Sequence, residues 1–411
     1  MIKSIEIQSW RQFNNINIEF HPKLTILTGA NGAGKTTILN IINQHFGWQN
    51  QLIGTAKRDN KTGGLKYLTG FWKSLFENSV INENHPDKIG VLKYSSNIST
   101  NLLIPKKIGT VYNIQIERQQ PLKGFNIPSH RPIYKYQSVP NIKTSVITKR
   151  QAFQQYRQSQ IQRYFGSRSE KTETYFIKET LISLAALGYG NQIVNANQSA
   201  INIYEGFIRI LKTVLPPKLG FRSLSVRIPE VVLETDSGEF SIDAVSGGIA
   251  SIIDLAWQIY MFDESDQQFI VSFDEPENHL HPEMQKTLLP NFLKAFPNVQ
   301  FIVASHNPFI ISSVSDSNVY ALIYDENNKV NSELLEGVEK SGTANEILRQ
   351  ALGIESTAPE WVENKIDELI RKYSDSGITP DNIAKFKNEL NSIGLSKYIH
   401  QAVVDFITNQ K

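Results

Sequence analysis

The segment from Gly29 to Thr36 has the residue types that a phosphate-binding loop needs. It reads Gly-Ala-Asn-Gly-Ala-Gly-Lys-Thr, and its three glycines let backbone N–H groups approach an anion closely. The lysine can reach the outer phosphates of a nucleotide, and the threonine hydroxyl can ligate Mg²⁺. We therefore expect ATP and Mg²⁺ as cofactors. The expected nucleotide-binding residues are Asn31, Gly32, Ala33, Gly34, Lys35, Thr36 and Thr37.

Two adjacent carboxylates follow an apolar stretch further along the chain. Residues 269–273 read Phe-Ile-Val-Ser-Phe, and Asp274 and Glu275 come directly after them. At the end of a buried strand Asp274 can hold Mg²⁺ through its water shell, and Glu275 can orient or deprotonate the attacking water. The alternative is a pair of solvated carboxylates that begin a loop, and the phosphate loop upstream makes that interpretation the weaker one.

Ser305 and His306 follow the next apolar stretch, residues 301–304. A neutral imidazole at this place can contact the γ-phosphate and respond to its loss. A single histidine at a strand end more often has a structural role. The position one strand beyond the paired carboxylates favours a functional role, so we assign Glu275 and His306 as the catalytic residues.

A Ser-Gly-Gly turn, Ser246, Gly247 and Gly248, precedes an apolar segment of helical length. Its N–H groups and its hydroxyl form a second anion-binding cradle at the start of that helix. One chain has one phosphate loop and hence one γ-phosphate. A second cradle is useful if it closes on the nucleotide of another copy, so the sequence predicts a homodimer or a higher homo-oligomer.

In this order the motifs resemble those of ABC-type ATPases. The stretch from Asp274 to Pro282, Asp-Glu-Pro-Glu-Asn-His-Leu-His-Pro, is similar to the non-transporter branch that includes RecF-like, SMC-like and OLD-type ATPases. The resemblance covers residues 1–45 and 226–325, and it implies that Arg11 lies near the nucleotide and that the cradle faces the ATP of a partner copy. The fold it implies is α/β, an ABC-type P-loop NTPase head whose mixed sheet has an antiparallel lobe, with a helical insertion and a helical C-terminal tail.

The chain departs from that family in two places. The cradle reads Val-Ser-Gly-Gly-Ile-Ala, where the family has leucine first and a polar residue after the glycines, and this implies slow hydrolysis. The family's glutamine loop is not evident; the best candidate runs from Ser129 to Gln137, which makes Gln137 a further candidate ligand for Mg²⁺. His279 and His281 have the spacing of a metal site, but the family carries this pattern in a turn, and we assign no metal there.

The elements that must position these residues are indicated by apolar periodicity. Strands are expected at 2–8, 15–20, 23–29, 269–273 and 301–304, with a hairpin over 231–242. Helices are expected at 35–45, 66–78, 174–189, 199–214 and 249–262. A further helix is expected between the strands 269–273 and 301–304, and three more in the tail, at 362–373, 383–393 and 396–407.

These elements group into four segments. Residues 1–100 form a first ATPase lobe with the phosphate loop, and 101–225 form a basic, partly helical insertion. Residues 226–335 form a second lobe with the cradle, the carboxylates and the histidine, and 336–411 form a helical tail. Glycine and proline occur throughout the insertion without sustained heptads, so a long coiled-coil arm is not expected.

Composition limits the remaining chemistry. The chain of 411 residues has 42 Lys and Arg against 40 Asp and Glu, so its total charge indicates neither a polyanion-binding protein nor an acidic tail. The absence of cysteine excludes disulfides, cysteine-ligated zinc and a thiol nucleophile. There is neither a secretion signal nor an apolar run of about 18 residues, and we expect a cytoplasmic protein without a membrane partner.

Charge is concentrated in one part of the chain. Residues 101–171 contain 13 Lys and Arg but only two acidic residues, Glu117 and Glu170, and aromatic residues are interleaved with the cations. Such a composition suits phosphates and stacked bases, so nucleic acid is a candidate partner. The alternative is a lobe whose cations pair with the acidic remainder of the chain, and the sequence leaves both open.

Free-standing heads of this kind resemble the ATPase subunits of bacterial anti-phage systems such as Septu, PARIS and retron-linked pairs. The resemblance implies a switch that binds and hydrolyses ATP and controls a partner effector, a nuclease or a toxin. A first alternative is a RecF-like repair ATPase that binds duplex or gapped DNA. A second is the energy-coupling subunit of a transporter, against which the Glu-Asn-His-Leu-His-Pro turn argues.

Overall fold

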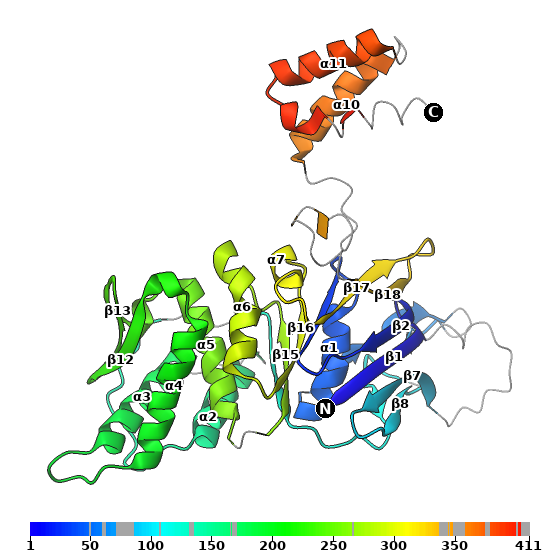
Figure 1. Cartoon of the computed structure of the whole chain (residues 1–411). Helices are drawn as coiled ribbons and strands as arrows, with labels where there is room; N and C mark the ends of the chain where they lie inside the picture. The colour runs from blue at the N-terminus through cyan, green and yellow to red at the C-terminus, as the bar shows by residue number, and fades with distance from the viewer. Residues whose placement is uncertain are drawn as a thin grey trace. The chain divides into compact units, whose positions relative to one another are not determined.

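The computed structural model describes two compact units, Met1–Gly353 and Ile354–Lys411 (Figure 1). The described residues are 1–48, 51–59, 63–70, 86–106, 108–130, 135–164, 166, 171–264, 267–336, 344, 346–347, 358–374, 379–399 and 402–403. Among them, no helix combines the length and the apolar character that crossing a bilayer requires.

An eleven-stranded mixed sheet runs through the first unit. In spatial order its strands are β10 (Gln115–Ile116), β8 (Ser99–Ile104), β7 (Asp87–Tyr94), β1 (Ile2–Trp10), β2 (Phe13–Glu19), β18 (Val330–Leu334), β17 (Asn318–Tyr324), β3 (Leu24–Gly29), β16 (Val299–Ala304), β15 (Phe269–Asp274) and β11 (Gly124–Ile127). The five strands from β17 to β11 pair parallel with one another, whereas β10, β8, β7, β1 and β2 pair antiparallel with one another. Strand β18 joins the two groups, antiparallel to β17 and parallel to β2. The expected α/β fold with an antiparallel lobe is confirmed.

The parallel strands are buried on both faces. Side chains alternate along a strand, so Phe269, Val271 and Phe273 of β15 pack into one core and Ile270 packs into another. The second core contains α1 (Lys35–Asn43), and α1 and α6 lie on opposite sides of β15 and β16 in Figure 1. Burial on both faces explains why these strands read as continuous apolar runs.

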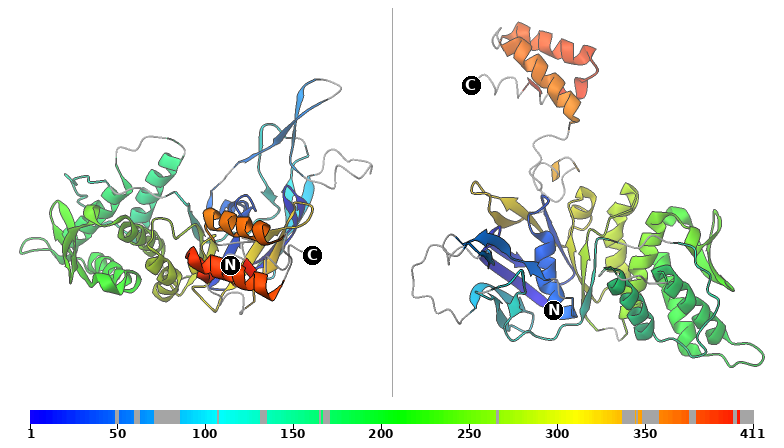
Figure 2. Two further views of the ribbon diagram at one scale, coloured as in Figure 1. Left: turned by 90° about the horizontal axis from the view of Figure 1, so that it is seen from above. Right: turned by 180° about the vertical axis from the view of Figure 1, so that it is seen from behind.

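A helical layer covers the other face and extends beyond the sheet edge. Its helices pack against one another through contacts such as the edge-to-face pair of Phe207 and Trp257, whose ring centroids are 5.0 Å apart. Figures 1 and 2 place this layer together with a three-stranded sheet. The elements are α2 (Lys149–Tyr164), α3 (Glu173–Tyr189), α4 (Gln198–Val214), α5 (Gly247–Phe262), α6 (Pro282–Ala295), β12 (Phe221–Arg227), β13 (Glu230–Thr235) and β14 (Gly238–Ser241).

The second unit contains α10 (Glu360–Ser374), α11 (Pro380–Ser392) and a 3-10 turn, η5 (Ser396–Tyr398). Thr379 caps α11 by accepting a hydrogen bond from the N–H of Asn382. The two expected apolar faces meet in one core that contains Val362, Leu369, Phe386 and Leu390. Most of the third expected tail helix, 396–407, lies outside the described residues.

The strands, the hairpin and most helices that the sequence predicts are confirmed, with small differences at their ends. The helix expected at 66–78 is wrong where it is described, because β6 (Leu65–Leu68) pairs antiparallel with β5 (Thr55–Arg58); residues 71–85 lie outside the described part. Helix α2 was not expected. Most of its residues are polar, and it is held by a few buried side chains such as Tyr156.

Candidate nucleotide site

The predicted phosphate loop joins the end of β3 at Gly29 to the start of α1 at Lys35. The φ values of Gly29, Gly32 and Gly34 are 135°, 83° and 101°, in the region that residues other than glycine rarely adopt. A side chain at Gly34 would also overlap the Phe13 ring. The sequence therefore places glycine where the turn requires it, and the N-terminus of α1 points its free N–H groups into the loop.

Lys35 and Thr36 connect the loop to its surroundings. The Lys35 Nζ donates hydrogen bonds to the carbonyl oxygens of Gly29 at 2.7 Å and Ala30 at 3.1 Å, so the ammonium lies inside the loop. Burial lowers the pKa of Lys35, and the nearby carboxylates partly offset this. The Thr36 hydroxyl donates to Asp274 Oδ2 at 3.1 Å, so the structure brings the two predicted Mg²⁺ ligands together.

The paired carboxylates lie at the carboxyl end of β15, beside the loop. Burial raises the pKa of Asp274, and the hydrogen bond from Thr36 partly offsets this. Glu275 has a positive φ of 49°, and its N–H donates to the Ala304 carbonyl at 2.8 Å. A non-glycine residue in this conformation is sterically disfavoured, and such residues are concentrated at functional sites.

Both carboxylate oxygens of Glu275 are engaged. Oε1 lies 3.3 Å from Nδ1 of His306, and Oε2 accepts a hydrogen bond from Nδ2 of Asn278 at 3.1 Å. The structure therefore brings the two predicted catalytic residues into contact. Because both oxygens have a partner, the carboxylate has a defined orientation at the edge of the sheet where Thr36 and Asp274 meet.

The Ser-Gly-Gly turn begins α5. Ser246 is the N-cap residue, yet its hydroxyl makes no capping hydrogen bond, and both Ser246 and Gly247 are exposed. A Cβ at Gly247 would have no atom within 4 Å, whereas one at Gly248 would lie 3.3 Å from the His279 carbonyl oxygen. The cradle is therefore open to a ligand from outside, beside the turn that follows the catalytic carboxylates.

Arg11 and Gln137 have partners other than the loop. Arg11 donates from Nε to the Tyr112 hydroxyl at 3.1 Å and from a terminal nitrogen to the Ile53 carbonyl at 2.7 Å. These partners belong to the ribbon of β4 (Leu52–Ile53) and β9 (Val111–Tyr112). The neighbouring Gln12 reaches the loop instead, where its Nε2 lies 3.4 Å from the Gly32 carbonyl oxygen.

Gln137 was a candidate Mg²⁺ ligand, and its contacts do not support that role. Its Oε1 accepts hydrogen bonds from the N–H of Thr172 at 3.0 Å and from the Thr172 hydroxyl at 3.3 Å. The carboxamide oxygen that would ligate the metal is thus used at the start of α3. Residues 131–134 of the candidate glutamine loop lie outside the described part.

Three residues near the carboxylates were not predicted. Asn278 bonds Glu275 and also donates to the Ser129 carbonyl at 3.3 Å, so the start of the candidate glutamine loop lies beside the site. The charge of His130, next in the chain, helps to lower the pKa of Asp274 against the effect of burial. Glu277 is buried close to His306. These contacts depend on turn conformations, for which a periodic sequence pattern gives no signal.

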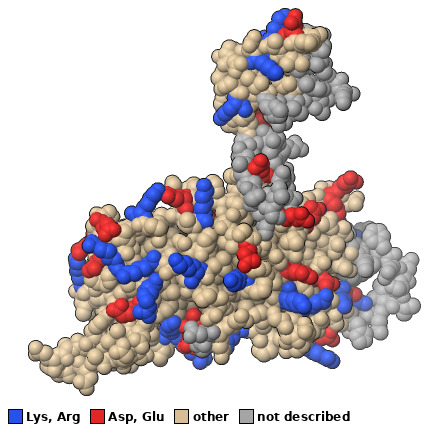
Figure 3. Space-filling view, in the orientation of Figure 1, with Lys and Arg blue, Asp and Glu red and all other residues tan. Residues whose placement is uncertain are grey.

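The basic segment 101–171 has many of its cations bonded within the fold. A terminal nitrogen of Arg163 lies 2.5 Å from the Glu173 carboxylate, and Arg157 stacks over the Trp48 ring with burial lowering its pKa to about 10. Lys106, Lys123, Lys149 and Lys171 also have partners; Lys107, Arg131 and Arg168 lie outside the described residues. On the face drawn in Figure 3 cations and carboxylates are mixed. These pairings favour the structural interpretation of the segment.

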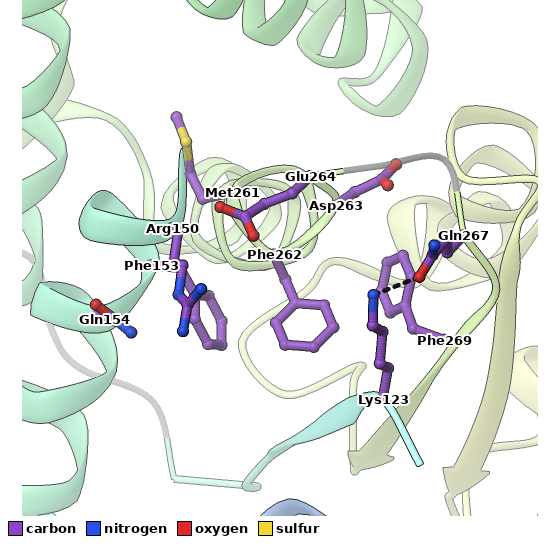
Figure 4. A pocket seen from close by; sticks show the side chains of 10 residues that line it. All are labelled: Lys123, Arg150, Phe153, Gln154, Met261, Phe262, Asp263, Glu264, Gln267 and Phe269. Atoms are coloured by element: carbon purple, nitrogen blue, oxygen red, sulfur yellow. Dashed lines mark hydrogen bonds between the residues drawn. The ribbon is translucent and has the colours of Figure 1, made fainter. Parts of the chain in front are cut away.

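A cavity of about 380 Å³ lies at the other end of β15 (Figure 4). Its walls include Phe269, at the start of the strand, and Phe153 and Phe262, while Lys123 bonds Gln267 at its rim. None of its lining residues belongs to the phosphate loop or to the carboxylate pair. The cavity is therefore separate from the nucleotide site.

Comparisons with known proteins agree with this arrangement. A family described as "AAA domain, putative AbiEii toxin, Type IV TA system" matches residues 24–312. The chain is 22% identical over 380 residues to the Septu protein PtuA of Bacillus thuringiensis, and the alignment covers 88% of this chain and 87% of the relative. It is 30% identical over 114 residues to the Retron Ec83 probable ATPase of Escherichia coli, covering 25% of this chain and 21% of the relative.

Among solved structures, the SMC head domain from Thermotoga maritima aligns with a TM-score of 0.43 at 13% identity, covering 82% of this chain and 99% of that one. The family match includes the phosphate loop, the cradle, the paired carboxylates and the histidine, and it extends over more than half of the chain. The chain therefore belongs to this AAA-domain family, and it is an ABC-type ATPase related to the defence proteins of Septu and retron systems.

Proposed function

We propose that the chain is a switch that binds ATP, hydrolyses it slowly to ADP and phosphate, and does so as a homodimer or a higher homo-oligomer. The observation that carries the proposal is an unequal division of the site. One phosphate loop is surrounded by Thr36, Asp274, Glu275 and His306. The cradle is exposed, and within the described part of the chain the Ser246 hydroxyl makes no capping hydrogen bond. The cradle thus has the donors to complete a site on another copy.

The proposed metal is Mg²⁺, and its candidate ligands fit it. Mg²⁺ prefers oxygen ligands, and the Thr36 hydroxyl and the Asp274 carboxylate oxygens are 3.1 and 3.4 Å apart at the mouth of the loop. When bound between these residues and the phosphates, Mg²⁺ would neutralise charge on the nucleotide.

The chain's own groups supply the rest of the chemistry. Lys35 places a positive charge inside the loop, where the outer phosphates are proposed to bind. Glu275, oriented by Asn278 and His306, is placed to accept a proton from water that attacks the γ-phosphate. His306 is in contact with this carboxylate, so loss of the γ-phosphate would alter the surroundings of both side chains.

The oligomer is tested with Glu275→Gln. This variant should bind ATP but not hydrolyse it, because the amide keeps the shape of the side chain and loses the proton acceptor. Light scattering should then show a dimer or larger assembly only with ATP. Adding Ser246→Arg should leave ATP bound and abolish the assembly, and Lys35→Ala should abolish both. A Glu275→Gln protein that binds ATP and stays monomeric would contradict the composite site.

We further propose that the nucleotide state controls a partner effector, a nuclease or a toxin, in bacterial anti-phage defence. The support is the likeness to a Septu protein over most of both chains and to a retron ATPase over a shorter stretch. Purification from the native host should recover a partner whose retention differs between the wild type and Lys35→Ala. Equal retention by both proteins would mean that nucleotide does not control the complex.

A further inference from the structure

Glu277 is a buried carboxyl that the proposed chemistry does not use. It lies in the turn between β15 and α6 and is 5% exposed. Its Oε1 accepts a hydrogen bond from the Ser305 hydroxyl, whereas Oε2 is buried without a hydrogen-bond partner among the described residues. A buried carboxyl with one oxygen left without a hydrogen bond is costly, so a fold that keeps one needs an explanation.

Ser305, the partner of Glu277, is completely buried at the end of β16. Its N–H donates to the Leu27 carbonyl oxygen at 3.0 Å, which ties it to the strand that carries the phosphate loop. Its hydroxyl donates to Glu277 and accepts a hydrogen bond from the N–H of Asn307 at 3.0 Å. The Ser305 hydroxyl is therefore fixed from two sides.

Asn307 holds the other end of the short segment from Ser305 to Asn307. Its Nδ2 donates to Gln285 Oε1 of α6 at 2.8 Å, and its Oδ1 accepts from the N–H of Phe309 at 2.8 Å. His306 lies between Ser305 and Asn307, so both of its backbone neighbours are held. The half-exposed His306 ring contacts Glu275 at 3.3 Å, which is its only ion pair among the residues that the structure describes.

We propose that Glu277 is a positioning residue that acts through Ser305 to hold His306 against Glu275. It does not touch the nucleotide. The inference rests on the proposed hydrolysis at this site, and it assigns a role to the third position after Asp274. Burial raises the pKa of Glu277, and the bond from Ser305 only partly offsets this, which is consistent with a carboxyl that acts as a hydrogen-bond acceptor rather than as a charge.

Steady-state kinetics separate positioning from simple support of the fold. Glu277→Ala should lower kcat about tenfold, the effect of one lost hydrogen bond, with little change in KM for ATP. Glu277→Gln should restore most of kcat because the amide oxygen still accepts from Ser305. Ser305→Ala should be as slow as Glu277→Ala, and the double variant no slower, because both act through the same bond.

The chain offers a matched control in the helical layer. Glu173 is 1% exposed, and its Oε1 accepts a hydrogen bond from the Ser159 hydroxyl at 3.4 Å, so it shares with Glu277 a buried carboxyl bonded by a serine, away from the loop; it differs in that Arg163 also pairs with it. Glu173→Ala and Ser159→Ala should lower the midpoint of thermal unfolding and leave kcat unchanged. A Glu277→Gln protein as slow as Glu277→Ala would overturn the proposal, since the charge would then matter.

A readout that needs no hydrolysis keeps the inference distinct from the proposed function. The imidazole carbon resonance of His306, assigned with His306→Gln, should shift in nucleotide-free Glu277→Ala and Ser305→Ala and stay in place in Ser159→Ala. An unchanged resonance in both Glu277→Ala and Ser305→Ala would overturn the positioning role. If the wild-type protein does not hydrolyse ATP, the proposed function fails, whereas the resonance still tests the arrangement.

Discussion

Gly34 shows how closely single residues are constrained at the loop. Its φ of 101° disfavours any side chain, and a Cβ there would overlap the Phe13 ring and lie 2.8 Å from Nε2 of Gln12. Gly47 has a similar φ of 73°, but a Cβ there would meet no atom within 4 Å. The two glycines therefore separate the cost of the backbone conformation from the cost of the overlap.

Gly34→Ala should destabilise the fold more than Gly47→Ala. The left-handed conformation costs both variants about 1–2 kcal/mol, and the overlap adds to this at Gly34 only. Urea denaturation gives both free energies of unfolding, and calorimetry should show that only Gly34→Ala loses ATP affinity. Equal effects at both glycines would mean that Phe13 and Gln12 move aside without cost.

Glu277 predicts a pH dependence of stability. Its pKa is raised above 4.5 by burial, so the folded chain holds this proton over a range in which the unfolded chain has released it. The contribution of Glu277 to stability is therefore lost as the pH rises from 4.5 to the folded pKa. Across that range, the free energy of unfolding of Glu277→Gln should therefore increase relative to that of the wild type as the pH rises.

The ionisable neighbours of Glu277 include His306, Glu275 and Lys35, and they remain in the variant. The free energies of unfolding of the two proteins are therefore compared with each other at each pH, rather than one protein being compared with itself across pH values. Denaturation at pH 4, 6 and 8 would show the gain, and parallel curves for the two proteins would contradict it.

The sequence predicted the phosphate loop and Asp274-Glu275 because their function depends on residues adjacent in the chain. It did not predict Asn278 or Gln12, whose roles arise when separate loops meet. The candidate ligand Gln137 did not gain support because a glutamine serves equally well as a partner for backbone N–H groups, and here it binds Thr172.

Lys178 connects elements around the cradle. This residue of α3 is completely buried and bonds Asp243, which belongs to the 3-10 turn η4 (Ile242–Ala244) just before Ser246. Its Nζ also lies 2.8 Å from Glu230 Oε2 of β13 and 3.0 Å from the Gln137 carbonyl oxygen. One ammonium thus joins a helix, a strand and the segment that leads into the cradle.

Lys178→Met should lower the free energy of unfolding by about 3–5 kcal/mol, because it leaves two carboxylates without their buried cation. Lys212→Met is the control, since Lys212 is exposed on the neighbouring α4 and should change stability by less than about 0.5 kcal/mol. Chemical denaturation measures both. A small effect at Lys178 would show that water or a rearranged partner replaces the ammonium.

At the scale of elements, the sequence predicted well where one periodicity persisted. The parallel strands have continuous apolar runs, α3 and α4 have helical apolar periodicity and α5 is largely apolar, and these elements are confirmed. Helix α2 was not predicted because few of its residues are apolar, although Phe153 packs against Phe125 and Phe262. Other contacts of α2 are polar: the Arg157 guanidinium donates to the Asn126 carbonyl oxygen at 2.7 Å, and the Tyr156 hydroxyl bonds Asp254. Such contacts produce no apolar stripe.

On the scale of the whole molecule, each compact unit has its own hydrophobic core. The core of Ile354–Lys411 is formed by residues between Val362 and Ala402, and the two cores of the first unit contain none of them. All predicted nucleotide, catalytic and cradle residues belong to Met1–Gly353. The first unit therefore has the groups that the proposed reaction needs.

A chain shortened to residues 1–353 should keep its ATP affinity and its own unfolding transition. Calorimetry with ATP and a thermal scan of the shortened and full chains would test this. The full chain should show the same transition for the first unit. Loss of ATP binding in a folded, shortened chain would mean that the second unit contributes to the nucleotide site.

The order of strands in the large sheet has a consequence for biosynthesis. Strand β3, which carries the phosphate loop, is paired on one side by β16 and on the other by β17. A ribosome adding residues at the usual rate needs roughly 14–54 s to cover the chain between Gly29 and Val299. Until then β3 has neither neighbour, so a nascent chain cannot complete the site, and the proposed ATP-dependent assembly can form only after synthesis has passed the last of these strands.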